Sequence, residues 1–529
     1  MKRHGHLSLV KRGADDDGPL TAVALRERLQ VHAAAVAAVV DEWAVRDAPV
    51  SFKDVEQALR EVVFAFARIA IMLFLALRED HLMRTYPLQV EHGGRRFRRA
   101  PAIPRSLTTL FGVVRYARTY MREVGHRARR GFHPLDVALG LVGDRFSWNV
   151  LTMAARLATK LSFAEARATL ALFVPDAPST EVIEHTVLGL GRHTAAWFEQ
   201  APAPEGDGEV LVIMFDGKGA PTATDSELSR RRGKRRRQHL PASPRHRGRH
   251  RRRRWGKKPR RKKGDKSKNA KMATMVVMFT LHRHSNKLLG PINRKLYASF
   301  APKKHAFAIA RRDANKRGFA PGAGKLIQIV TDGDPDLTTY ATEYFPEAMH
   351  TIDVMHVIEK LWTAGECLFR EGTDPLRQWI DVQKDRLYTG KVDEVIAELC
   401  QRRHVIATTG PGNKGKRERL LSVIRYLEKR IHQMPYDKVI KLDLELGSGA
   451  VEGAVKNIIG KRCDHGGMRW IEERVEAIVQ LRCIEANGDW DRFIEFVHDR
   501  MQADAQRDGT RLRLQSSTAA ELPTLIEAA

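Results

Sequence analysis

The sequence predicts an α/β fold in which short, fully buried strands are followed by acidic residues. Residues 210–215 are six apolar residues in a row. The run is too short for an ordinary core helix and too continuous for a half-exposed strand, so it predicts a central strand buried on both faces. Residues 326–331 and the apolar run around 349–354 have the same character. Helical patterns such as 306–316 lie between the strands, as expected for an open α/β sheet.

A carboxylate lies at the end of each predicted strand. Asp216 follows the first strand, Asp332 follows the second, and Asp353 closes the third. Open α/β sheets bind ligands beyond the carboxyl ends of their strands, so we expect a binding site at this edge. For any one of these residues taken alone, a simple turn-forming Asp is the alternative.

A further carboxylate, Glu452, lies in a helix predicted within residues 447–462, where Ser448 is the expected N-cap. An apolar stripe at helical spacing can lie on the sheet and consists of Val451, Val455, Ile458 and Ile459. Because Glu452 lies at the rim of this stripe, it can converge with Asp216 and Asp332. Carboxylates gathered without Lys or Arg raise one another's pKa unless a hard cation compensates their charge. The pattern therefore predicts Mg²⁺ binding, with Mn²⁺ as a substitute, and two such ions suit phosphoryl transfer.

Five motifs follow one another along this part of the chain. They are FDGKG at 215–219, TDGD at 331–334, FPEAMHTIDVMHVIEKLW at 345–362, GSGAVEGAVKNIIGKR at 447–462 and GGMRW at 466–470. In this order they resemble the bacterial insertion-sequence transposases of the ISKra type. These DDE enzymes are relatives of the Mutator-like transposases and have an RNase H-like catalytic core. The similarity covers roughly residues 107–482.

The resemblance implies an Asp-Asp-Glu metal-binding triad made of Asp216, Asp332 and Glu452. It matches Asp353 and His356 to the Asp-x-x-His element of the family. The implied activity is metal-dependent strand cleavage and strand transfer at the ends of the protein's own insertion sequence. Spacing alone leaves Asp334 and Asp353 as competitors of Asp332. Two other functions stay open: an RNase H-like nuclease that cuts without joining, and a basic, non-catalytic DNA-binding protein whose acidic residues only form turns.

The positive charge of the chain predicts a polyanionic partner. Lys and Arg outnumber Asp and Glu by 91 to 63, a formal net charge of +28, and residues 230–271 hold 23 Lys and Arg against one Asp. That segment is expected to be a disordered basic loop when free, because it has almost no apolar residues. The expected partner is DNA. The resemblance specifies the element's terminal inverted repeats, the target DNA and a homo-oligomer assembled on them.

Side chains beside the expected site are predicted to contact this DNA. They are His356, Lys456, Lys461, Arg462, Arg469 and Trp470. For Trp470, both stacking on a flipped base and packing in the protein are open, and packing is the preferred interpretation.

The predicted architecture is an RNase H-like core with an all-helical insertion, preceded by a mainly helical DNA-binding region. The parts are a helical N-terminal region at 1–90, the DNA-binding region at 91–205, the first part of the core at 206–355, the insertion at 356–446, the last part of the core at 447–488 and a C-terminal tail at 489–529. The DNA-binding region contains a short basic hairpin within 95–122 and a helix-turn-helix pattern at 163–190. A solvated hairpin and two helices that only pack together are the alternatives.

The sequence favours the bacterial cytoplasm, with the protein on the nucleoid. The four cysteines form no CxxC pair, and the N-terminus has no apolar signal core. Residues 62–77 are strongly apolar, but they are too few to span a membrane and include Arg68. We therefore expect no membrane partner.

Overall fold

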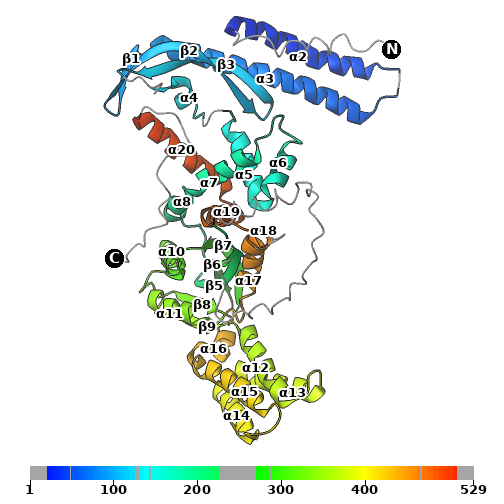
Figure 1. The fold of residues 1–529 in the computed structure, drawn as a ribbon, viewed down its shortest axis with the longest axis vertical. Helices are drawn as coiled ribbons and strands as arrows, with labels where there is room; N and C mark the ends of the chain where they lie inside the picture. Colours follow the sequence, from blue (N-terminus) through cyan, green and yellow to red (C-terminus); the bar gives the residue numbers. More distant parts are fainter. Residues whose placement is uncertain are drawn as a thin grey trace, which may run out of the picture. The chain divides into compact units, whose positions relative to one another are not determined.

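The structure is a computed structural model that describes residues 21–47, 49–125, 131–141, 145–224, 270–285, 287–464 and 468–508. These residues form helices and two β-sheets, which confirms the predicted α/β class (Figure 1). They belong to two compact units. The first unit falls within Met1–His193 and Asp489–Ala520, and the second within Thr194–Gly488. None of the described helices is long and apolar enough to cross a membrane.

The first unit contains a four-stranded antiparallel sheet in the order β1-β2-β3-β4. Its strands are β1 (Gln89–His92), β2 (Arg95–Thr109), β3 (Gly112–Glu123) and β4 (Gly131–Phe132). Two long helices, α2 (Ala22–Ala44) and α3 (Phe52–Thr85), pack against each other, and α3 also packs on β3. The predicted hairpin within 95–122 is confirmed, but it is not short. Its strands are 15 and 12 residues long, because apolar side chains of α3 cover the β2–β3 pair.

Further helices complete the first unit. They are α4 (Pro134–Ala138), α5 (Trp148–Lys160), α6 (Phe163–Leu170), α7 (Thr180–Gly191) and α20 (Trp490–Asp508). Ser162 and Ser179 cap α6 and α7, which pack on each other and on α5, so the two helices of the predicted helix-turn-helix pattern are confirmed. The predicted C-terminal tail is wrong for residues 490–508. Apolar residues at helical spacing, Phe493, Val497 and Met501, give α20 a buried face.

The second unit contains a five-stranded sheet in the order β7-β6-β5-β8-β9 (Figure 1). Its strands are β5 (Val210–Pro221), β6 (Ala270–His284), β7 (Lys287–Ser299), β8 (Leu326–Thr331) and β9 (Met349–Ile352). Strands β5, β8 and β9 are parallel, whereas β6 and β7 are antiparallel to their neighbours. The expectation that β5 ends at Asp216 is wrong. Its pairing with β8 ends at Phe215, but its pairing with β6 continues to Pro221.

Helices pack around this sheet. They include α8 (Thr194–Gln200), α10 (Lys303–Lys316), α11 (Pro335–Tyr344) and α19 (Glu472–Ala486). Glu452 belongs to one continuous helical segment made of α17 (Gly449–Ala454), η2 (Val455–Gly460) and α18 (Lys461–Cys463). This segment contacts β5 and β6, and its predicted apolar stripe is buried, at most 8 % exposed. Its middle part, η2, is π-helical, a geometry that is frequent at functional sites.

The chain between β9 and α17 is helical, as predicted for residues 356–446. Its helices are α12 (Val354–Leu368), α13 (Asp374–Tyr388), α14 (Val392–Val405), α15 (Asn413–Glu428), η1 (Ile431–Gln433) and α16 (Tyr436–Lys441). They share an apolar core of their own, which includes Leu361, Ile380, Leu399 and Leu420.

The predicted basic loop at 230–271 lies outside the described residues as far as residue 269. Its last two residues begin β6. The predicted boundary is therefore wrong at this end, because Lys271 pairs with Ala220 in the strand ladder and forms an ion pair with Glu472.

Candidate metal centre

Three aspartates follow neighbouring, aligned strand positions in the second unit. In the parallel pairs, Phe215 is aligned with Thr331, and Thr331 is aligned with Ile352. The next residues along these strands are Asp216, Asp332 and Asp353. Neighbouring strands are about 4.8 Å apart, and aligned residues of parallel strands point to the same face. The three carboxylates therefore lie at the edge of the sheet where the sequence predicted a ligand site.

Asp353 is buried, 1 % exposed, and both of its carboxylate oxygens are engaged. Oδ1 accepts a hydrogen bond from the Met355 N–H (2.7 Å), which caps α12. Oδ2 accepts from the Ser448 N–H (3.0 Å) and from the Ser448 hydroxyl, and lies 3.4 Å from Nδ1 of His356. Burial raises the pKa of this carboxyl, but the hydrogen bonds outweigh that effect and lower the pKa to about 2.

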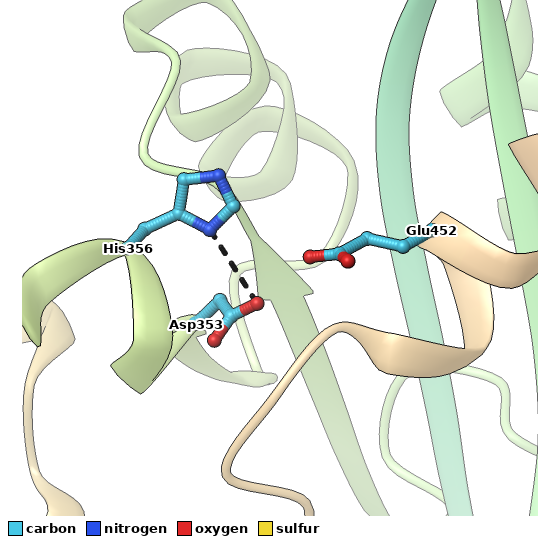
Figure 2. A group of neighbouring side chains, drawn as sticks. All are labelled: Asp353, His356 and Glu452. Atoms are coloured by element: carbon cyan, nitrogen blue, oxygen red, sulfur yellow. Dashed lines mark ion pairs between the residues drawn. The ribbon is translucent and has the colours of Figure 1, made fainter. Parts of the chain in front are cut away.

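Ser448 connects Asp353 to the helical segment that carries Glu452. It occupies the predicted N-cap position of α17, but its hydroxyl makes no capping hydrogen bond. The hydroxyl oxygen lies between two carboxylates instead, since it donates to Asp353 and is 3.2 Å from Oε1 of Glu452. Figure 2 shows Asp353, His356 and Glu452 facing one another. One ligand atom of each lies within 4.8 Å of the others. Oxygen and imidazole ligands at this spacing can hold a divalent cation.

Asp216 lies outside this group of three but within its electrostatic reach. Burial raises the pKa of the Asp216 carboxyl, and the negative charges of Asp332 and Glu452 add to the rise. A hydrogen bond from the Gly217 N–H (2.6 Å) to Oδ1 and the charge of His356 oppose it. The other oxygen of Asp216 has no hydrogen-bond partner among the described residues. A hard cation would relieve the repulsion between these carboxylates.

Asp332 is the strand-end aspartate best placed to supply a second acidic ligand. Its Oδ1 accepts from the Asp334 N–H (2.8 Å), and its Oδ2 has no hydrogen-bond partner in the described part of the chain. Asp334 is engaged elsewhere, because it caps α11 through the Asp336 N–H (2.8 Å) and pairs with Lys303 (2.9 Å). Asp353 has both oxygens occupied. Asp332 is therefore a candidate ligand, whereas Asp353 positions the helix start and, with His356 and Glu452, forms the group at metal-ligand spacing in the described part of the chain.

The sequence analysis did not predict the places of two side chains in this site, His356 and Ser448. His356 was grouped with the DNA-contacting residues, but its ring lies among the carboxylates. The Asp-x-x-His spacing contained a signal, since residues three apart are neighbours on a helix surface. The bridging hydroxyl of Ser448 had no local signal, because its partner Asp353 is 95 residues away along the chain.

The other predicted DNA-contacting residues differ in exposure. Lys456 and Lys461 are exposed, and Arg469 is half-buried. Trp470 is buried, and its indole N–H donates to a backbone carbonyl (3.1 Å). The guanidinium of Arg462, which is 2 % exposed, lies 4.7 Å from the centre of the Trp470 ring. Packing of Trp470 is confirmed and its stacking on a base is wrong, because both side chains are covered by protein.

No protein-family model matches the sequence, and no curated protein matches it either. The transposase resemblance of the motifs therefore receives no support from these comparisons. Among the described residues, the group at metal-ligand spacing consists of Asp353, His356 and Glu452.

We expect Asp353→Asn to remove a pH-dependent part of the stability. The pKa of Asp353 is lowered in the folded protein, so its carboxylate stabilises the fold above the unfolded-chain pKa of about 3.9. This contribution, on the order of 2 kcal/mol, is lost as the pH falls from about 5 through about 2. Urea unfolding of the wild type and of Asp353→Asn between about pH 5 and about pH 2 measures this contribution. A stability difference between them that is the same at every pH would contradict the assignment.

Proposed function

We propose that the protein is a DDE transposase with an RNase H-like core, which cuts DNA at the ends of its own insertion sequence and joins these ends to target DNA. The observation that carries the proposal is the alignment of Asp216 and Asp332 at the point where β5 and β8 stop pairing, with Glu452 on the helical segment that packs on β5. The charges of Asp332 and Glu452 both act on Asp216, so the three carboxylates share one electrostatic environment.

These carboxylates fit Mg²⁺ because each keeps one oxygen without a hydrogen-bond partner, and no Lys or Arg pairs with them among the described residues. Asp216, Asp332 and Glu452 would hold a pair of such ions, which would supply activation of a water or a 3′-hydroxyl and stabilisation of the leaving oxygen of a phosphodiester. The chain orients the ligands for this task. Asp353 holds the start of α17 through Ser448, and the turn after β8 presents Asp332.

The architecture of the second unit supports the RNase H-like assignment. Three parallel strands carry the acidic ends, and two antiparallel strands complete the sheet. The helices α12 to α16 separate Asp353 from Glu452 along the chain, as the all-helical insertion does in the transposases that the motifs resemble. The net charge of +28 supports DNA as the partner, and a bacterial cytoplasmic protein that forms a homo-oligomer on DNA fits this function.

A strand-transfer assay tests the proposal. The purified protein is incubated in Mg²⁺ with duplexes that carry the two ends of its insertion sequence and with a plasmid target. We expect cleavage at the ends and covalent joining to the target, both abolished by EDTA. Cleavage without joining would favour the nuclease, and binding without cleavage would favour the non-catalytic DNA-binding protein.

One surface of the first unit suits the DNA backbone. Arg98 of β2 lies directly opposite Arg122 of β3, and both side chains are exposed without an ion-pair partner among the described residues. Like charges in this position repel each other. Arginine pairs well with phosphate, so a bound backbone would relieve the repulsion.

We expect Arg98→Gln combined with Arg122→Gln to reduce the slope of log affinity against log salt by about 1.8, because each lost phosphate contact on duplex DNA is worth about 0.9. Fluorescence anisotropy with duplex DNA in EDTA measures the slope without cleavage. The matched control is Arg26→Gln combined with Arg78→Gln, which removes two exposed arginines from α2 and α3. If the control reduced the slope equally, or if the Arg98/Arg122 double variant did not reduce it, the hairpin would not contact DNA.

A further inference from the structure

Arg430 connects the all-helical insertion to the turn that carries Asp332. It follows α15 and directly precedes η1. Its Nε and Nη2 both donate to the carbonyl oxygen of Gly333, at 2.9 and 2.7 Å. Gly333 is the residue directly after Asp332. Two N–H groups of one rigid, planar guanidinium therefore hold the carbonyl next to the proposed metal ligand.

The surroundings of Gly333 are closely packed. The Arg430 guanidinium lies over the ring of Tyr426, 4.3 Å from its centre. Gly333 has a φ of +82°, and a Cβ atom at this position would lie 2.8 Å from the Tyr426 hydroxyl oxygen. Glycine is needed here for its backbone conformation and for space.

Two further contacts attach the insertion to the same sheet edge. The Tyr436 hydroxyl donates to the Ile352 carbonyl (3.0 Å), and the Val354 N–H donates to the Leu446 carbonyl (3.0 Å). Ile352 and Val354 flank Asp353, so these contacts hold the chain on both sides of that residue. The Arg430 contact extends the attachment to the turn of Asp332.

We propose that Arg430 is a positioning residue that holds the Asp332 carboxylate toward Asp216 for metal binding. The metal centre would thereby depend on where the insertion lies. This inference rests on the proposed role of Asp332 as a metal ligand. Loss of a residue that orients a metal ligand typically weakens metal affinity by about 10- to 100-fold.

Mn²⁺ binding to the full-length protein without DNA, followed by electron paramagnetic resonance, tests the inference. Arg430→Ala should weaken Mn²⁺ binding by about tenfold or more. Arg430→Lys should weaken Mn²⁺ binding less, because the ammonium keeps the positive charge. It should still weaken it, because an ammonium cannot make the bidentate contact to the Gly333 carbonyl. Tyr426→Phe is the matched control and should bind Mn²⁺ as the wild type does. Its missing hydroxyl has no hydrogen-bond partner among the described residues, and the ring beneath Arg430 is kept.

Added guanidinium ions separate this positioning role from a general structural one. They should restore Mn²⁺ binding to Arg430→Ala, because a free ion can donate to the Gly333 carbonyl in the space that the side chain leaves. Methylammonium should not restore it. Wild-type Mn²⁺ affinity in Arg430→Ala, or a loss in both Arg430 variants that guanidinium does not reverse, would overturn the inference. If the wild-type protein bound no Mn²⁺, that result would instead contradict the proposed metal centre and the proposed function.

Discussion

Replacing Asp216 or Asp332 with asparagine should abolish Mg²⁺-dependent cleavage while DNA binding and the fold persist. In the proposed metal centre each carboxylate supplies an oxygen ligand, and the neutral amide is a poor ligand for a hard cation. We expect a rate loss on the order of 10³-fold, equivalent to roughly 4 kcal/mol of transition-state stabilisation. Single-turnover cleavage of an end duplex measures the rate, and calorimetric titration with Mg²⁺ reports metal binding separately.

Asp334→Asn is the matched control for this pair, since it removes a carboxylate two residues from Asp332. Asparagine can still cap α11, so only the partly exposed ion pair with Lys303 is lost, and the free energy of unfolding should fall by about 0.5 kcal/mol. Cleavage should be retained. Full activity in Asp332→Asn together with lost metal binding in Asp353→Asn would show that Asp353 is the second ligand.

Glu452→Gln should also stop cleavage and joining, with the protein still folded. The change keeps side-chain volume and helix propensity but removes the charge, so metal is held more weakly. Glu452→Asp keeps the charge and shortens the side chain by one methylene, a displacement that costs on the order of 10²-fold in rate. Cleavage rates in Mg²⁺ and in Mn²⁺ measure both variants, and partial recovery in Mn²⁺ is expected for Glu452→Asp alone. Full Mg²⁺-dependent activity in Glu452→Gln would exclude Glu452 from the metal centre.

Elements that bury a regular set of apolar residues could be predicted from the sequence. β8 has the predicted bounds, and the stripe beside Glu452 is buried as expected. The lengths of other strands were predicted less well. β5 continues past Asp216, and β2 and β3 form a long hairpin, because a strand ends where its neighbour stops pairing with it.

The sequence by itself determined the α/β class, the position of Asp332 directly after β8, and the helix that carries Glu452. Burial periodicity is a local property, so each of these could be read from a short stretch of chain. The tertiary structure alone decided which carboxylates are already engaged: Asp353 is held by Ser448, 95 residues away, and Asp334 pairs with Lys303. These outcomes depend on which distant groups meet, and no local pattern of residues carries that information.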